Sequence, residues 1–171
     1  MLSEFANKMQ GQYTLEDLTT LETIEDILVF QTFNSQIALD LGCLIVQKSQ
    51  RYPEEVAVMI KREADGVNIF QYVADSKAQR NIDFAMRKRL AVLASGHSSL
   101  WPLVHRVVTG EGELVEEALP VGGAFPIKVD GHIVATLAVS GLHEGMDFQI
   151  IVDSLREYLQ VSIPDFRGQL V

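Results

Sequence analysis

Two Asp-Gly dipeptides constrain the fold of this chain more than any other feature, because each separates two runs rich in β-branched residues. Asp65-Gly66 lies between "VAVMI" and "VNIFQYV", and Asp130-Gly131 lies between "FPIKV" and "HIVATLAVS". Such a pair can take the positive φ angles of a tight type I′ turn, which joins antiparallel strands. We therefore predict two β-hairpins. The last strand is apolar on both faces, which predicts a central position in the sheet.

Helical periodicity predicts helices before the first hairpin. The first begins at Thr14, where a Thr-x-x-Asp capping box opens an apolar stripe of Leu15, Leu18, Leu21 and Ile24. Ser35 is expected to cap a second helix, which must end before Pro53 because proline cannot continue a helix.

Three more helices are predicted between and after the hairpins. Residues 77–95 read as a long helix, and Gly96 suits a left-handed cap at its end. Ser98 or Ser99 is expected to cap a shorter helix through "LWPLVHRVV". The last helix covers residues 147–159, with Asp147 as its cap.

These elements predict an α+β fold, in which helices cover an antiparallel sheet of four or five strands. Its topology resembles a sensor module of the profilin or PAS type. The length of 171 residues and the 47% hydrophobic composition favour a single domain over residues 1–171. Residues 1–12 are expected to form an N-terminal extension, and residues 161–171 a partly apolar tail that packs on a neighbouring chain.

Charge and composition exclude several classes of function. A formal net charge of −9 repels phosphate backbones, so no nucleic-acid partner is expected. No signal-peptide pattern and no membrane-length apolar run occurs, so we expect a cytoplasmic protein without a membrane partner. Cys43 is the only cysteine, which excludes an intramolecular disulfide, and its apolar setting predicts a small buried thiol.

The segment "GHSS" at residues 96–99 carries the strongest chemical signal. His97 could bind a ligand or a metal, act as a general base beside Ser98 or Ser99, or donate to the end of the preceding helix. The two serines are equally explained as helix caps. The segment is not a Gly-x-Ser-x-Gly nucleophile elbow, and no two histidines share the i, i+4 spacing of a helical metal pair, so no metal site is predicted.

Arg87, Lys88 and Arg89 form the one basic cluster of the chain. Successive residues are about 100° apart on a helix, so the three cannot all face one way, and at least one is expected to point toward residues 97–99. They form either a solvated face or a clamp for a carboxylate. The segment "PVGGAF" lacks the features of a phosphate-binding loop, which favours a bend that admits close backbone packing.

Two stretches together resemble the heme-degrading-domain superfamily. "GGAFPIKVDGHIVATLAVSGLHEGMDFQIIVDSL" resembles its C-terminal signature, and the matching residues are Gly122, Gly123, Pro126, Ile127, Gly131, Val139, Ser140, Gly141 and Asp147. "RKRLAVLASGHSS" is similar to a motif of one branch of uncharacterised intracellular proteins, and the matching residues are Arg87, Lys88, Gly96, His97, Ser98 and Ser99. In this superfamily secreted relatives bind and can degrade heme, and others sit in glycolate-utilisation operons. Members of this branch are associated with ring-like assemblies and protein partners.

Three hypotheses of function follow. The leading one is a homo-oligomeric protein that binds a small ligand at residues 87–99, with heme as the candidate cofactor. His97 would ligate or hydrogen-bond this ligand, Arg87 and Arg89 would pair with its carboxylates, and Ser98 and Ser99 would cap the adjoining helix. The second is an assembly or interaction protein without catalytic activity, which has a protein partner. The third is an enzyme of unknown substrate that uses His97 with Ser98 or Ser99, and the sequence leaves catalysis open.

Overall fold

The computed structural model describes residues 2–171, and its centre is a four-stranded antiparallel sheet. The strands are β1 (Ala57–Arg62), β2 (Asn68–Val73), β3 (Ala124–Val129) and β4 (His132–Ser140), in the order β2-β1-β4-β3. The predicted α+β fold is confirmed. The apolar strand β4 is central as expected, because it pairs with β1 on one side and β3 on the other.

Both hairpins form, but only the second has the predicted turn. Asp130 and Gly131 take φ angles of 51° and 78° and connect the paired residues Val129 and His132 directly. The prediction of a type I′ turn at Asp65-Gly66 is wrong, since of the two only Gly66 has a positive φ and residues 63–67 form a longer loop. The Asp65 carboxylate explains the difference, because it accepts hydrogen bonds from the Arg62 guanidinium at 2.6 and 3.0 Å.

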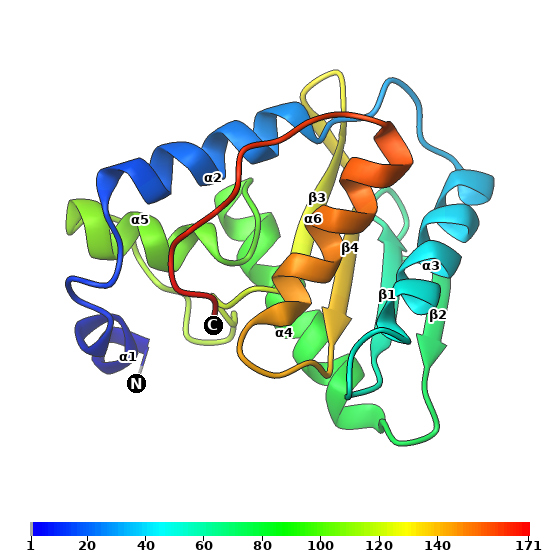
Figure 1. Ribbon diagram of the computed structural model, residues 1–171, viewed down its shortest axis with the longest axis horizontal. Coiled ribbons are helices and arrows are strands. Elements are labelled where there is room, and N and C mark those ends of the chain that lie inside the picture. The colour runs from blue at the N-terminus through cyan, green and yellow to red at the C-terminus, as the bar shows by residue number, and fades with distance from the viewer. Residues whose placement is uncertain (1) are drawn as a thin grey trace.

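Within residues 2–171, six helices surround the sheet (Figure 1). They are α1 (Leu2–Lys8), α2 (Leu15–Ile27), α3 (Ser35–Ser49), α4 (Gln79–Ser95), α5 (Trp101–Thr109) and α6 (Met146–Leu159). Helices α3 and α6 pack on one face of the sheet, while α4 crosses the other face over a small cluster that includes Met59, Ala85 and Ala138. Helices α2 and α5 lie together beyond the β3 edge and extend the larger core. No helix in residues 2–171 combines the length and apolar character needed to cross a membrane.

Local signals set most helix ends. The capping box at Thr14 is confirmed, with hydrogen bonds in both directions between Thr14 and Asp17 at 2.8 and 3.1 Å. Helix α4 ends at Gly96 as predicted. The cap of α3 is Asn34 and not Ser35, because the Asn34 side chain accepts from the Ile37 amide at 2.9 Å.

Three expectations change where the chain folds back on itself. Within the expected extension, α1 forms and buries Ala6 against the main core. Cys43 is exposed, because α3 turns the neighbouring Gly42 toward the sheet and Cys43 away from it. The tail packs on its own chain, where the Tyr13 hydroxyl donates to Gln169 O at 2.7 Å and Gly122 N donates to Val171 O at 2.7 Å.

Candidate functional site

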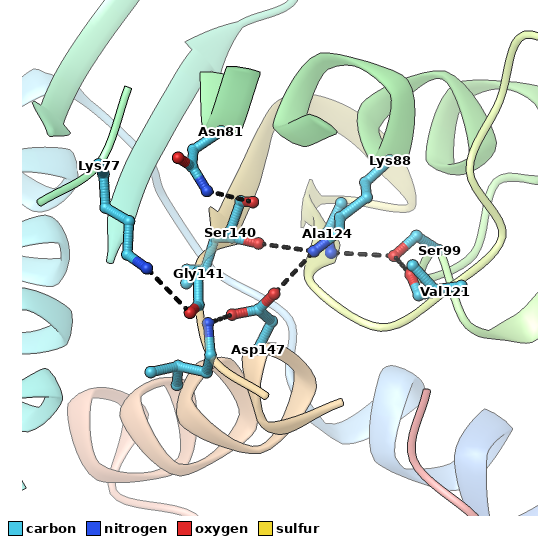
Figure 2. Close-up of polar contacts among 11 residues, drawn as sticks. Lys77, Asn81, Lys88, Ser99, Val121, Ala124, Ser140, Gly141 and Asp147 are labelled. Carbon is cyan, nitrogen blue, oxygen red and sulfur yellow. Dashed lines mark hydrogen bonds and ion pairs between the residues drawn. The ribbon is translucent and has the colours of Figure 1, made fainter. Parts of the chain in front are cut away.

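A buried ion pair joins α4 to the start of α6, next to the end of β4. Lys88 Nζ lies 2.9 Å from Asp147 Oδ2 and also donates to Val139 O at 3.0 Å (Figure 2). The other carboxylate oxygen, Oδ1, accepts from Leu142 N at 2.9 Å. Lys88 is 4% exposed and Asp147 6%. The prediction that Asp147 caps α6 is therefore wrong: Gly145 stands at the cap, and the Asp147 carboxylate pairs with an ammonium group instead.

The glycines before β3 make room for this lysine. A Cβ atom at Gly123 would lie 2.5 Å from Lys88 Nζ and 2.7 Å from Val139 O, and the φ of Gly123 is 125°. Only glycine satisfies both the close approach and the backbone angle. This confirms the prediction that "PVGGAF" is a bend that admits close backbone packing.

A cavity of about 400 Å³ opens beside the ion pair, and we call it the lysine cavity. Its polar wall comes from four segments of the chain and includes Lys77, Asn81, Lys88, Ser140 and Asp147. Gly122, Ser140, Gly141 and Asp147 of the C-terminal signature thus meet Lys88 of the basic motif at one cavity.

The basic cluster points in three directions, as its helical spacing requires. Arg87 Nε donates to Glu117 O at 3.3 Å. Lys88 enters the ion pair, and the Arg89 guanidinium contacts both carboxylate oxygens of Glu63, its terminal nitrogen lying 2.7 Å from Oε1. The three side chains do not converge on one ligand site.

His97 and Ser98 both bind a carboxylate that comes from α2. His97 Nδ1 lies 2.9 Å from Glu25 Oε1, which also accepts from Ser98 N at 3.1 Å. The Ser98 hydroxyl donates to Glu25 Oε2 at 2.9 Å, and Glu25 is 5% exposed. Neither hydroxyl of Ser98 and Ser99 is hydrogen-bonded to the imidazole, so the pair that a serine nucleophile would need does not form.

The expected capping role of these serines is also wrong. Leu100 is the N-cap of α5, and no side chain caps that helix. Ser99 instead binds the segment that leads into β3, since its hydroxyl donates to Val121 O at 2.5 Å and accepts from Ala124 N at 2.9 Å. In Figure 2 Ser99 lies on the opposite side of Ala124 from Lys88, so the two motifs meet through the backbone at the start of β3.

Three aromatic rings stack beside this junction. The His97 and Trp101 ring centroids are 3.9 Å apart with planes 8° from parallel, and those of Trp101 and His105 are 4.4 Å apart at 21°. Trp101 Nε1 donates to Glu22 Oε1 at 3.0 Å, which fixes the indole between the two imidazoles.

A second cavity, of about 430 Å³, lies between α4, α5 and the loop that follows α5, and we call it the α4–α5 groove. Ala91 and Ala94 form its α4 wall, and Trp101 and His105 form its α5 wall. Loop residues 112–115, 118 and 120 close the third side. The groove is mainly apolar, with the His105 imidazole as one of its few polar groups.

Sequence comparison assigns the family. A model of the family described as "Haem degrading protein HbpS-like" matches residues 33–156. The chain belongs to the HbpS-like family. It is 29% identical over 161 residues to a UPF0303 protein of Psychromonas ingrahamii, covering 89% of this chain and 97% of that protein. It is 32% identical over 148 residues to a UPF0303 protein of Streptomyces avermitilis, covering 81% and 88% of the two chains. The resemblance seen in the sequence motifs is confirmed.

Solved structures of similar proteins agree with this assignment to the HbpS-like family. The Ybr137w protein superposes with a TM-score of 0.74 at 28% identity, covering 84% of this chain and 87% of that one. The PduOC:heme complex has a TM-score of 0.61 at 16% identity, covering 78% and 99%, and HbpS has a TM-score of 0.59 at 17% identity, covering 76% and 92%. These last two show a shared fold.

The HbpS-like family raises the question of whether residues of this chain fit heme. A heme site needs apolar walls, an axial donor for the iron and cations near the propionates. His97, Arg87 and Arg89 do not surround one cavity, and Glu63 already neutralises Arg89. The α4–α5 groove fits better, because it combines apolar walls with the His105 imidazole. Arg87 lies close to this groove, since it donates to Glu117 O and Glu117 is next to the lining residue Ala118.

The sequence did not reveal the acidic partners of these motifs. Glu25 follows Leu18 and Leu21 at i+7 and i+4, so it lies on the buried stripe of α2. A carboxylate on an apolar stripe needs a buried donor, and that position was the available signal. Glu63 carried no such pattern.

Proposed function

We propose that the protein binds a small apolar ligand that carries a carboxylate, with heme as the candidate, in the α4–α5 groove. The observation that carries this proposal is the lining of the groove, where mainly apolar side chains surround one imidazole in a volume of about 430 Å³, with Ser95 and Glu113 as further polar residues. Ligand pockets commonly have this composition and size. Membership of a family described as haem-degrading, and a fold shared with the PduOC:heme complex, support heme as the first ligand to test.

Each nearby residue has a distinct role in this proposal. His105 would hold the iron, and Arg87 would pair with a propionate at the loop side of the groove. Heme, when bound, would supply a redox-active iron centre. His97 would act through Trp101, because it stacks on the indole that forms one wall of the groove.

In the competing assignment, His97 is itself the ligand of the iron. Its Nδ1 faces the buried Glu25 carboxylate. An imidazole held at Nδ1 in this way can present its other ring nitrogen, Nε2, to a metal. The two assignments differ in which histidine is indispensable for hemin binding.

An absorption titration with hemin separates these cases. We expect a saturable, stoichiometric Soret shift in the wild type and in His132→Ala, a control at the β3–β4 turn that does not line the groove. His105→Ala should lose the saturable shift, whereas His97→Ala should keep it. Loss in His97→Ala alone would move ligation out of the groove, and an unsaturable change in the wild type would refute heme binding.

We also propose that the protein forms a homo-oligomer and that α4 is the helix through which two copies make contact. Leu90 and Leu93 are 38% and 41% exposed on this helix, and large apolar side chains at adjacent surface positions favour a protein contact. Light scattering should give a mass above that of one chain in the wild type and in Leu39→Glu, a control on α3 where the leucine is 47% exposed. Leu90→Glu/Leu93→Glu should give the mass of one chain, and an unchanged mass contradicts the proposed interface.

A further inference from the structure

The lysine cavity contains more free donors than acceptors. Lys88 Nζ uses two of its three N–H groups, on Val139 O and Asp147 Oδ2. Lys77 Nζ has a single protein acceptor among the described residues, Gly141 O at 3.2 Å. Both carboxylate oxygens of Asp147 already accept hydrogen bonds. A ligand that completes this site must therefore bring acceptor oxygens.

Two ammonium groups in the cavity wall favour an anionic ligand. Lys77 and Lys88 line the cavity together with one acidic side chain, Asp147, and Val171, the last residue of the sequence, lies on the same wall. His143 at the rim is itself paired with Glu54, with Nδ1 2.8 Å from Oε1. Because Lys88 is almost fully buried, a hydrogen bond to its ammonium group is less screened than one at the surface.

The hydroxyl of Ser140 adds a third donor near the two lysines. Ser140 Oγ accepts from Asn81 Nδ2 at 3.4 Å, and Asn81 Oδ1 is held by Ala78 N at 3.1 Å. The amide orientation is thus fixed by the backbone, which leaves the hydroxyl proton to donate elsewhere. Figure 2 shows Lys77, Asn81, Ser140, Lys88 and Asp147 around this part of the site.

The remaining lining limits the ligand's size and character. Phe84, Leu119, Val121 and Leu142 supply apolar surface, and the volume is about 400 Å³. On the same wall, Gly122 N already donates to Val171 O at 2.7 Å, so the ligand's acceptor oxygens must be bound by the lysines and Ser140.

We propose that the lysine cavity binds a small aliphatic carboxylate, with the carboxylate group at Lys88, Lys77 and Ser140 and the aliphatic chain against Phe84 and Leu119. This site is separate from the α4–α5 groove and does not depend on heme binding there.

Butyrate and butyramide are the matched probes, because they share a chain and differ in whether the head group is charged. Titration of ¹⁵N-labelled protein, followed by amide chemical shifts, should show saturable changes at Gly122, Gly141 and Leu142 with butyrate. Butyramide at the same concentrations should leave these amides unchanged. Equal responses to both probes, or no saturable response to butyrate, would overturn the proposal.

The variants locate the binding energy. Lys88→Met alone leaves a buried carboxylate unpaired, so we pair it with Asp147→Asn, which removes both charges and keeps an acceptor for Leu142 N. K88M/D147N should weaken butyrate binding at least about tenfold, as expected for a lost charged hydrogen bond. Lys77→Met should weaken it less, since Lys77 is more exposed.

The charge control is Lys61→Met, which removes an equal charge from the outer end of β1, where Lys61 Nζ bonds Gly66 O. Binding should stay within about twofold of wild type, because Lys61 does not line the cavity and salt screens a charge that makes no direct contact with the ligand. Unchanged binding in folded K88M/D147N, or equal weakening in Lys61→Met, contradicts the assignment to Lys88.

Discussion

Breaking the Lys88–Asp147 pair tests the most buried electrostatic contact in the site. Lys88→Met preserves the length of the side chain but leaves the Asp147 carboxylate with Leu142 N as its remaining donor. Removing one partner of a buried pair typically costs about 3–5 kcal/mol. That is a large fraction of the roughly 5–15 kcal/mol by which a domain is stable. The second substitution, Asp147→Asn, should recover at least about 2 kcal/mol, because it removes the unpaired charge.

Urea denaturation measures each corner of this double-mutant cycle. Far-UV circular dichroism and the fluorescence of Trp101, the only tryptophan, should give coincident transitions if unfolding is two-state. The reasoning is refuted if Lys88→Met costs less than about 1 kcal/mol, or if the two single costs simply add in the double variant. Additive costs would mean that the two side chains do not stabilise each other.

Three further substitutions test other contacts. Thr14→Ala removes the capping box and should cost about 0.5–2 kcal/mol in urea denaturation. Burial raises the pKa of the Tyr13 phenol, so its hydrogen bond to Gln169 should persist above the ordinary phenol pKa near 10 and be lost as the pH rises through the folded-state value. In an ultraviolet titration of the four tyrosines, the last phenolate should appear only with unfolding, and Tyr13→Phe should abolish that step. Gly123→Ala should lower the melting temperature more than Gly131→Ala, because a Cβ at Gly123 meets a lysine nitrogen 2.5 Å away and one at Gly131 meets nothing within 4 Å.

Local chemistry explains which parts of the fold the sequence predicts. The turn at Asp130-Gly131 and the capping box at Thr14 depend on residues next to each other in the chain, so their patterns can be read directly. The prediction of a type I′ turn at Asp65-Gly66 is wrong for a related reason. The Arg62 guanidinium binds the Asp65 carboxylate, and this contact competes with the preference of Asp-Gly for that turn.

The candidate site depends on contacts that are distant in sequence. Lys88 and Asp147 are 59 residues apart, and Glu25 and His97 are 72 apart. Serine is a residue type typical of helix caps. The hydroxyl of Ser98 nevertheless binds the Glu25 carboxylate of α2, because a hydrogen bond to a charged acceptor is stronger than one to a backbone amide. A pattern within one segment cannot show which distant carboxylate will arrive there. The sequence therefore indicates which residues carry chemistry better than it indicates their partners.

The two proposed ligand sites share one wall, formed by residues 118–121. Ala118 and Pro120 line the α4–α5 groove, whereas Leu119 and Val121 line the lysine cavity, so alternate side chains face opposite cavities. The segment is anchored at both ends, because Leu119 N donates to Arg87 O at 3.0 Å and Val121 O accepts from Ser99.

A ligand that displaces this segment from one side must move it on the other. Saturating butyrate should therefore change the hemin affinity, and hemin should change the butyrate affinity by the same factor, since coupling between two sites is reciprocal. Butyramide should have no effect on either. If both ligands bind and neither affinity changes, residues 118–121 do not move on binding. The two cavities then act independently, although only this segment separates them.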